Sequence, residues 1–262
     1  MRAVLRAAHP GPALAVTLAG GLLAVAAGLD ALWVALVVAA VFAGQLSIGW
    51  SNDLVDLARD RAAHRGDKPL ANGQASAALV RGLCAAAVVL CVPLSLACGL
   101  VAGAVHLVCV AAGWAYNFGL KSTAWSWAPY AVAFGGLPVF VGRVDGGSGF
   151  ARWVPVVGAL LGVGAHLVNV VPDLDDDAAT GVRGLPHRLG ARVSVLLACA
   201  LLATGSVVVV LGAGLDLVLA VVGLVVVAAL VVVAATSGGR TAFRAAMAIA
   251  LVDVLLLAAA LR

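Results

Sequence analysis

Acidic side chains gather in two short segments of this chain. The sequence contains twelve Asp and no Glu residues, and eight of the twelve lie in these two segments. They are Asp53, Asp56, Asp60 and Asp67 in the first segment and Asp173, Asp175, Asp176 and Asp177 in the second. Both segments follow long apolar runs, and carboxylates near a bilayer are costly unless something cationic accompanies them. We therefore expect both segments to bind a cationic ligand.

The first segment, "SNDLVDLARDR" (51–61), has its acidic residues at helical spacing. Asp53, Asp56 and Asp60 are spaced i, i+3 and i+7, so they share one face of a helix. Asn52 lies one turn before Asp56 and adds an amide to this polar stretch.

The second segment repeats the arrangement over a longer stretch. Asn169, Asp173 and Asp177 are spaced i, i+4 and i+8, so they form a polar stripe that begins inside the preceding apolar run. Asp175 and Asp176 point elsewhere on such a helix, and we interpret them as solvated.

Mg²⁺ chemistry accounts for paired acidic motifs of this kind. Mg²⁺ takes oxygen ligands, keeps some waters, and is typically bound by one or two carboxylates together with substrate phosphates. The pattern therefore predicts a Mg²⁺–diphosphate clamp with the ligands Asp53, Asp56, Asp60, Asp173 and Asp177. Ca²⁺ fits less well because no loop resembles an EF-hand. The competing interpretation is a solvated run of charges.

Basic residues near the two motifs fit the same ligand. Lys68 lies in "DKPLANG", Lys121 in "YNFGLKS" and Arg183 in "GVRGLPHRLG". Together with a metal, such cations can neutralise a diphosphate leaving group as its bond to carbon breaks. The alternative for each is an anchor at the membrane interface.

The elements that must position these residues are apolar helices. The chain is 64% hydrophobic and 11% charged, with a mean hydropathy of +1.13, which a water-soluble protein of this size could not bury. We expect an all-α polytopic membrane protein, a single domain over residues 1–262, with about nine transmembrane helices. The predicted spans are 11–28, 31–50, 77–97, 99–117, 125–142, 153–171, 192–212, 215–235 and 242–261.

Charge asymmetry predicts the orientation. With the N-terminus in the cytoplasm and nine alternating spans, thirteen of the sixteen Lys and Arg residues lie inside, as the positive-inside rule favours. Both acidic motifs then lie on the cytoplasmic side, where we expect them to form one polar cap. The N-terminus resembles a signal peptide, yet further spans follow at once, so we interpret it as a retained first helix.

Several function classes are disfavoured by composition. A net charge of +4 is explained by topology and an anionic substrate, and nothing pairs a basic face with base-stacking aromatics, so no nucleic-acid partner is expected. The five cysteines lie in apolar runs without metal-finger spacing and are interpreted as small buried side chains.

The motifs resemble those of the UbiA superfamily of intramembrane prenyltransferases. "NDLVDLARD" matches the family pattern N-D-x-x-D-x-x-x-D, and "DLDDDAATGVRGLPHRLG" resembles its second motif with the Gly-Lys/Arg-Thr-Leu…Leu-Gly tail. "KPLANG" is similar to the family's Arg-Pro-Leu-x-Ser-Gly, and "YNFGLK" to its Tyr…Leu-Lys element. The resemblance places family site residues on Asn52, Asp53, Asp56, Asp60, Lys68, Tyr116, Lys121, Asn169, Asp173, Asp177 and Arg183.

The resemblance implies a mechanism and a setting. Mg²⁺ held by both Asp motifs would draw diphosphate from an allylic isoprenyl diphosphate, and the allylic cation would alkylate an acceptor, usually aromatic. The helices would surround a central cavity, with Tyr116 as the best candidate for cradling the cation. The lipid bilayer would supply the donor, and the protein would be a multi-pass protein of the cell membrane with a cytoplasmic active site.

Three features depart from the family pattern. The stretch from Asp60 to Lys68 is about one residue shorter than in many members, Gly184 stands where Thr is usual, and the outer loops are short. None of these touches the acidic motifs.

The histidines leave room for further roles. His166, one turn before Asn169, could orient the acceptor, and His64 and His187 could cover the site from cytoplasmic loops. His9 and His106 are interpreted as structural.

Other functions stay open at this point. The same ionisation could serve a membrane terpene cyclase or a transfer to a phosphorylated sugar, as in the family's phosphoribosyl-transferring branch. A divalent-ion transporter is a different class, but its carboxylates would run through the bilayer and not gather at one face. The contiguous signature of CDP-alcohol phosphotransferases is absent from the sequence.

Overall fold

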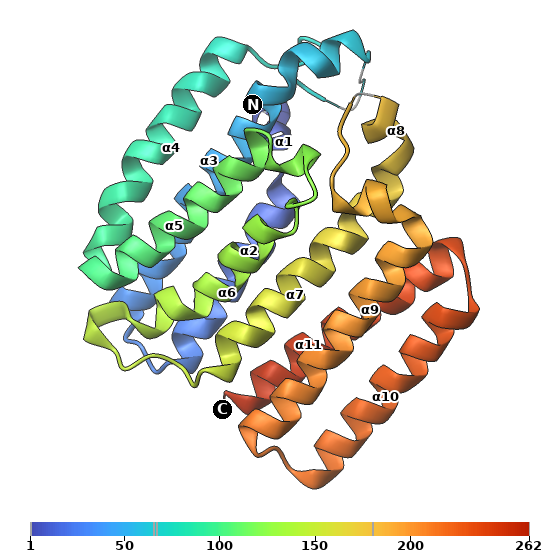
Figure 1. Cartoon of the computed structure of the whole chain (residues 1–262). Coiled ribbons are helices and arrows are strands. Elements are labelled where there is room, and N and C mark those ends of the chain that lie inside the picture. Colours follow the sequence, from blue (N-terminus) through green and yellow to red (C-terminus); the bar gives the residue numbers. More distant parts are fainter. Residues whose placement is uncertain (1, 65, 67, 180, 262) are drawn as a thin grey trace. The chain divides into compact units, whose positions relative to one another are not determined.

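The computed structural model describes residues 2–64, 66, 68–179 and 181–261, and all regular structure in these residues is helical (Figure 1). This confirms the predicted all-α class. The chain divides into two compact units, here called the first unit and the second unit. The first unit runs to Gly119 and includes Leu137–Gly149, and the second comprises Leu120–Gly136 and the chain from Phe150 onward. The predicted single domain over residues 1–262 stays a prediction.

The first unit is built from the N-terminal helices. They are α1 (Arg2–Ala7), α2 (Pro10–Ala26), α3 (Ala31–Ala62), α4 (Ala77–Ala97), α5 (Leu100–Asn117) and the last turns of α6 (Ala128–Gly142). Pro10 opens α2, where its fixed φ suits a first turn and its missing N–H costs nothing. Ser76 caps α4 by accepting a hydrogen bond from the Leu79 amide at 3.4 Å.

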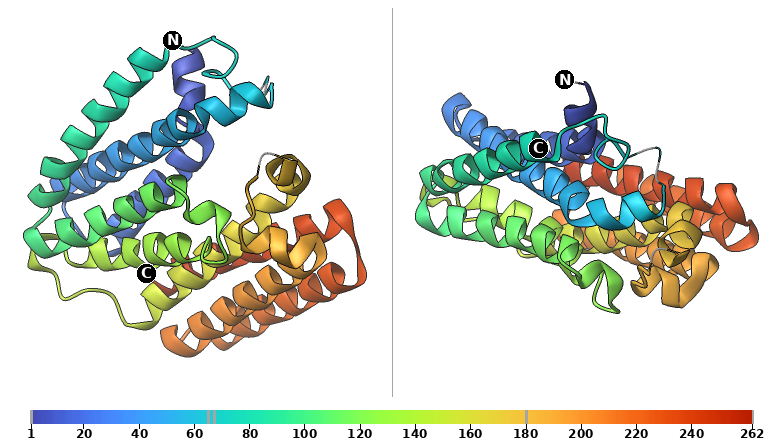
Figure 2. Two further views of the ribbon diagram at one scale, coloured as in Figure 1. Left: turned by 45° about the horizontal axis from the view of Figure 1, so that its top comes forward. Right: turned by 90° about the horizontal axis from the view of Figure 1, so that it is seen from above.

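The second unit contains the first turns of α6 and the C-terminal helices. These are α7 (Trp153–Val170), α8 (Leu174–Ala179), α9 (Leu185–Ala213), α10 (Leu217–Thr236) and α11 (Gly239–Ala260). α9, α10 and α11 run alongside one another in the different views (Figures 1 and 2). Asp216 caps α10 through the Val218 amide at 2.9 Å. The backbone of α9 kinks at Gly190, whose φ is 77°.

Seven helices in the described part of the chain are long and apolar enough to cross a membrane. Two shorter apolar helices, α2 with 17 residues and α6 with 15, lie at the predicted first and fifth spans, so the count of nine stays a prediction. α4 coincides with the predicted span 77–97. α9 begins earlier than the predicted start at residue 192, because Pro186 favours a first helical turn there.

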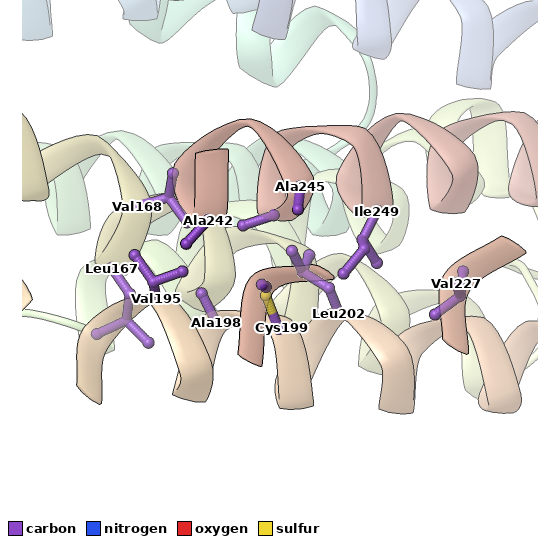
Figure 3. Packing of buried hydrophobic residues seen from close by; sticks show 12 residues of the cluster. Leu167, Val168, Val195, Ala198, Cys199, Leu202, Val227, Ala242, Ala245 and Ile249 are labelled. Atoms are coloured by element: carbon purple, nitrogen blue, oxygen red, sulfur yellow. The ribbon is translucent and has the colours of Figure 1, made fainter. Parts of the chain in front are cut away.

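Each unit has its own apolar core. In the second unit, side chains of α7, α9, α10 and α11 interlock around Leu167, Cys199, Leu202 and Ile249 (Figure 3). In the first unit, α1, α3 and α4 pack around Trp50, Leu70 and Val80. The five cysteines are all buried thiols, as predicted, and none of them is in a disulfide in the described part of the chain. Large apolar side chains also point outward, such as Leu211 at 80% exposure, which suits a surface that contacts lipid.

Candidate active site

The first acidic motif lies within α3, which continues through it as one helix of 32 residues. The predicted membrane span ended at residue 50, whereas the helix continues to Ala62 and therefore extends beyond the apolar run. Asp53, Asp56 and Asp60 are 2%, 6% and 3% exposed, in agreement with the predicted shared face. Buried carboxylates need compensating partners.

Asp53 has two basic partners on one of its oxygens. Lys68 Nζ donates to Asp53 Oδ1 at 2.8 Å, and His9 Nε2 lies 2.9 Å from the same oxygen. Lys68 Nζ and His9 Nε2 are 3.4 Å apart. Within the described residues, the other oxygen of this buried carboxylate, Oδ2, has no hydrogen-bond partner. Asp53 is therefore held in place by one oxygen, while the other is available to a ligand.

His9 contacts the candidate site, a role that the sequence interpretation missed. It occupies the junction between α1 and α2 with a left-handed φ of 51°. The junction packs tightly on α3: a Cβ on Gly49 would lie 2.2 Å from the Ala8 carbonyl oxygen, and Trp50 Nε1 donates to the Val4 carbonyl at 3.0 Å. Because Gly49 lies one turn before Asp53, this contact brings His9 to the carboxylate. The His9-Pro10 pair just before the first predicted span was the available signal.

Arg59 is a second residue missed at the site, since the sequence interpretation gave it only a topological role. Its Nη2 lies 2.8 Å from Asp56 Oδ2, and its Nε lies 3.8 Å from Asp60 Oδ1. The guanidinium thus offsets the charge of both carboxylates on the polar face of α3.

Asn52 joins the end of α5 to α3. Its Nδ2 donates to Asn117 Oδ1 at 3.1 Å, and Asn117 Nδ2 donates to Ser51 Oγ at 2.8 Å. Asn117 is buried, and Tyr116 beside it is half-buried. The amide contact fixes the position of the Tyr116 backbone against the motif. Asn117 stands in the quoted "YNFGLK" but was not singled out there.

A small cavity of about 330 Å³ opens beside Asp53. Its lining includes Arg6, His9, Asp53, Lys68 and Pro69. Three basic side chains next to one buried carboxylate suit an anion that arrives with a cation, because the anion meets the bases and the cation meets the carboxylate.

The second acidic motif is more open than the first. Asn169 in the last turn of α7 is exposed, and so is Asp173 in the 3₁₀ turn Val171–Asp173 that leads into α8. Asp177 in α8 is a quarter exposed, and its Oδ2 lies 3.6 Å from His187 Nε2. Asp67 and the side chains of Asp175 and Asp176 lie outside the described residues.

His187 lies in the first turn of α9 and not in a loop, which corrects the sequence interpretation. Pro186 starts the helix just before it, and the His187 side chain is only 6% exposed beneath Asp177. His64 follows the end of α3 and is exposed. His166 is enclosed in the second unit, with its ring centroid 4.6 Å from that of Tyr130.

Gly184 has a steric reason to depart from the usual Thr. It precedes α9 at the N-cap position, where a Cβ would lie 2.5 Å from the Lys121 carbonyl oxygen. The capping task falls to Ser126, whose Oγ accepts a hydrogen bond from the Leu185 amide at 2.9 Å. The same Oγ lies 3.0 Å from His166 Nε2. A distant serine thus replaces the local cap and fixes the turn that carries Lys121.

Lys121 and Arg183 differ in their surroundings. Lys121 lies in the 3₁₀ turn Leu120–Ser122 and is 8% exposed, whereas Arg183 is exposed in the connection between α8 and α9. The burial of Lys121 favours the predicted binding role over an anchor at the membrane interface, whose charged end would lie in water.

The carboxylates of the first unit suit a divalent cation that arrives with other ligands. No three His, Cys, Asp or Glu side chains among the described residues come close enough to enclose a metal by themselves. Asp53 Oδ2, which has no hydrogen-bond partner among the described residues, nevertheless offers a hard oxygen ligand in a buried setting. Mg²⁺ commonly takes one or two carboxylates and completes its shell with water and substrate phosphate, so the residues fit it in that form.

Comparison with known proteins agrees with the helical fold and the motifs. Residues 13–258 match the model of the UbiA prenyltransferase family, and the chain belongs to this family. Its apolar helices and its family make it a multi-pass membrane protein. A stretch of 110 residues is 37% identical to the bacteriochlorophyll synthase 33 kDa chain of Cereibacter sphaeroides. That match spans 38% of this chain and 36% of the relative.

Solved structures share the fold at low sequence identity. A digeranylgeranylglyceryl phosphate synthase superposes with a TM-score of 0.75 at 18% identity, covering 99% of this chain and 96% of its own. A UbiA homologue from Archaeoglobus fulgidus bound to GPP and Mg²⁺ has a TM-score of 0.74 at 16% identity, covering 98% of both chains. The apo UbiA homologue from Aeropyrum pernix K1 has a TM-score of 0.70 at 17% identity, covering 92% and 96%.

Proposed function

We propose that this protein is a Mg²⁺-dependent prenyltransferase that transfers the prenyl group of an allylic isoprenyl diphosphate to an aromatic acceptor. The observation that carries the proposal is the buried row of carboxylates on α3. Lys68 and His9 hold one oxygen of Asp53, and the other oxygen has no hydrogen-bond partner among the described residues. The Archaeoglobus fulgidus homologue is bound to GPP and Mg²⁺, which supports a prenyl diphosphate and Mg²⁺ as the ligands of this site.

Two sets of residues would carry the reaction. The carboxylates that bind the metal and drive ionisation would be Asp53, Asp56, Asp60, Asp173 and Asp177. The residues that bind substrate would be Asn52, Lys68, Tyr116, Lys121, Asn169 and Arg183. Bound Mg²⁺ supplies charge that neutralises the departing diphosphate.

The chain's own side chains contribute to the reaction by binding and shielding. Lys68, Lys121 and Arg183 would donate hydrogen bonds to diphosphate oxygens as charge gathers there. Tyr116 would stabilise the positive charge on the allylic carbon with its ring face, an effect of about 0.5–2 kcal/mol. The allylic C–O bond breaks with its electrons leaving on diphosphate, the acceptor's π electrons form the new bond to carbon, and the acceptor releases a proton.

The donor's chemistry fits a membrane setting. An isoprenoid tail partitions into lipid, while the diphosphate needs the charged end of the helices. Following the charge asymmetry, we place the protein in the cell membrane with its N-terminus and active site on the cytoplasmic side.

The test uses membranes that contain the protein, Mg²⁺, prenyl diphosphates of several lengths and a cell extract as a source of acceptors. Diphosphate release and the mass of the lipid product are measured. We expect release to require Mg²⁺ and to be lost in Asp53→Asn and in Asp173→Asn. Asp216→Asn is the matched control, because Asn replaces Asp equally well as the cap of α10.

Each outcome has a meaning. A product with the mass of acceptor plus prenyl group supports transfer, whereas a product with the mass of the prenyl chain alone indicates a cyclase. Release that persists in both Asp variants, or no release with any donor, contradicts the proposal.

A further inference from the structure

A second and larger cavity lies at the end of the second unit where α10 passes into α11. Its volume is about 800 Å³, and its lining includes Arg192, Arg240, Arg244, Pro172, Val195 and Phe243. We call it the arginine cleft. All of these residues belong to the second unit, and none is among the residues proposed for prenyl transfer.

The cleft carries positive charge that is not paired with any carboxylate among the described residues. Arg240 and Arg244 are spaced i, i+4 on α11, so their side chains emerge from the same face, and both are exposed. In the part of the chain that the structure describes, neither they nor Arg192 form an ion pair with an acidic residue. Two like charges one turn apart repel each other, so an anion placed near both would relieve that repulsion.

Arg192 gives the cleft a fixed wall. Its guanidinium donates to the carbonyl oxygens of Ala234, Ala235 and Ser237 at the end of α10. This contact ties α9 to the α10–α11 turn and supplies the capping that the last carbonyls of a helix need. The hydrogen bonds of Arg192 therefore hold the lining residues of α9 beside the turn that leads into α11.

The remaining walls are apolar. Val195, Phe243 and Pro172 line the cleft beside the arginines. Close to it, α10 and α11 expose large apolar side chains, including Val232 at 60% and Met247 at 46%. In a membrane these surfaces contact lipid tails, so a molecule that enters the cleft meets hydrocarbon on one side and guanidinium groups on the other.

We propose that the arginine cleft binds the phosphate headgroup of an anionic membrane phospholipid, with the glycerol and upper acyl chain against the apolar walls. Basic pockets between transmembrane helices on the cytoplasmic side are suited to such headgroups. Its volume lies within the ordinary range for small-molecule sites of about 300–1,000 Å³. The site is separate from the proposed prenyl transfer, so either can stand without the other.

The experiment measures which lipid the protein retains. The full chain is placed in nanodiscs made of equal parts phosphatidylglycerol and phosphatidylcholine, released into detergent, and analysed by native mass spectrometry. We expect wild type to retain phosphatidylglycerol in preference to phosphatidylcholine. Each arginine near an anionic lipid contributes about a five-fold gain, so the Arg240→Gln/Arg244→Gln variant should lose about 30-fold of that preference.

A matched control removes the same charge elsewhere. Arg2 and Arg81 are exposed, lie on the same predicted side of the membrane and belong to the first unit. The Arg2→Gln/Arg81→Gln variant should retain phosphatidylglycerol as wild type does. An equal loss in the control would show that overall charge, and not the cleft, sets the preference, and would overturn the proposal.

Gly238 allows a test that does not depend on removing arginines. It is the N-cap of α11, with an extended backbone and no atom within 4 Å of the place a Cβ would take, so a side chain has room there. Asp and Asn are both good N-caps, but only Asp adds negative charge beside the cleft. Gly238→Asp should lose the preference for phosphatidylglycerol without a fall in melting temperature, and Gly238→Asn should keep it.

Three results would overturn the proposal. One is a wild-type protein that retains both lipids equally, and another is a Gly238→Asp variant that keeps the wild-type preference. The third is displacement of phosphatidylglycerol from wild type by inorganic diphosphate at equal concentration, because the cleft would then be a site for a free phosphate anion.

Discussion

Replacing Lys68 with Met tests whether the ion pair at Asp53 prepares a metal ligand. In the wild type, Lys68 Nζ is 2.8 Å from a carboxylate that is 2% exposed. The substitution keeps the length of the side chain and removes its charge. Asp53 then retains His9 on Oδ1 and still has no partner on Oδ2 among the described residues.

The cost follows from the burial of the pair. Removing one partner of a fully buried ion pair costs about 3–5 kcal/mol, because the other charge is left uncompensated. The Lys68 side chain is 16% exposed and His9 remains in contact, so we expect a smaller cost of about 2–3 kcal/mol. For a chain of this length that corresponds to a fall in melting temperature of about 4–12 °C.

The assay is thermal unfolding of the purified protein in detergent with and without Mg²⁺. A cation bound at Asp53 replaces the charge that Lys68 supplied, so Mg²⁺ should raise the melting temperature of Lys68→Met more than that of wild type. Adding Asp53→Asn to Lys68→Met removes the stranded charge, so this double variant should regain most of the lost stability and show no such response to Mg²⁺. Arg81→Met is the control for loss of an exposed cation. Equal Mg²⁺ shifts in wild type and Lys68→Met would refute the reasoning.

Gly184 and Gly49 each lie so close to a neighbouring backbone that an added side chain should have a measurable effect. Gly82→Ala is the control for both, because a Cβ on Gly82 would have no atom within 4 Å. Gly184→Thr restores the usual family residue, yet it should lower the melting temperature and slow diphosphate release, since its Cβ would lie 2.5 Å from the Lys121 carbonyl oxygen. An unchanged rate of diphosphate release in Gly184→Thr would contradict this prediction, because it would mean that the turn at Lys121 shifts without affecting the site. Gly49→Ala should destabilise the protein by about 1–3 kcal/mol through overpacking against Ala8 and should displace His9 from Asp53. Limited trypsin digestion should then cut after Arg6 faster than in wild type, and an unchanged rate would contradict the packing assigned to this junction.

Local spacing made the helical part of this protein predictable. The apolar runs gave the helix positions closely, as α4 illustrates, because a transmembrane helix needs a minimum length of apolar residues and little else. The shared face of Asp53, Asp56 and Asp60 followed from helical periodicity alone. The predicted span ended at residue 50 while α3 continues to Ala62, because hydropathy marks where a helix leaves lipid and not where its hydrogen bonds stop.

Contacts between residues far apart in the chain were not predictable in the same way. His9 reaches Asp53 through the close approach at Gly49, and Ser126 caps α9 from 59 residues away. Such contacts depend on how helices pack, which no local pattern encodes. The ion pair of Arg59 with Asp56 could have been predicted from the sequence, since the two residues are spaced i, i+3. It was missed because Arg59 was considered only as a charge that sets the membrane orientation.

The unbroken length of α3 links the acidic motif to the thickness of the membrane. Asp53 follows Ala31 by about 33 Å along the helix axis and Asp60 by about 44 Å, whereas the hydrocarbon layer is about 30 Å thick. An upright α3 therefore holds its first carboxylate at the edge of the hydrocarbon and its last among the headgroups. Lipids with longer acyl chains would draw this end of α3 into the hydrocarbon, and shorter ones would move it among the headgroups. The acyl composition of the host bilayer would therefore set the depth of the acidic motif in the membrane.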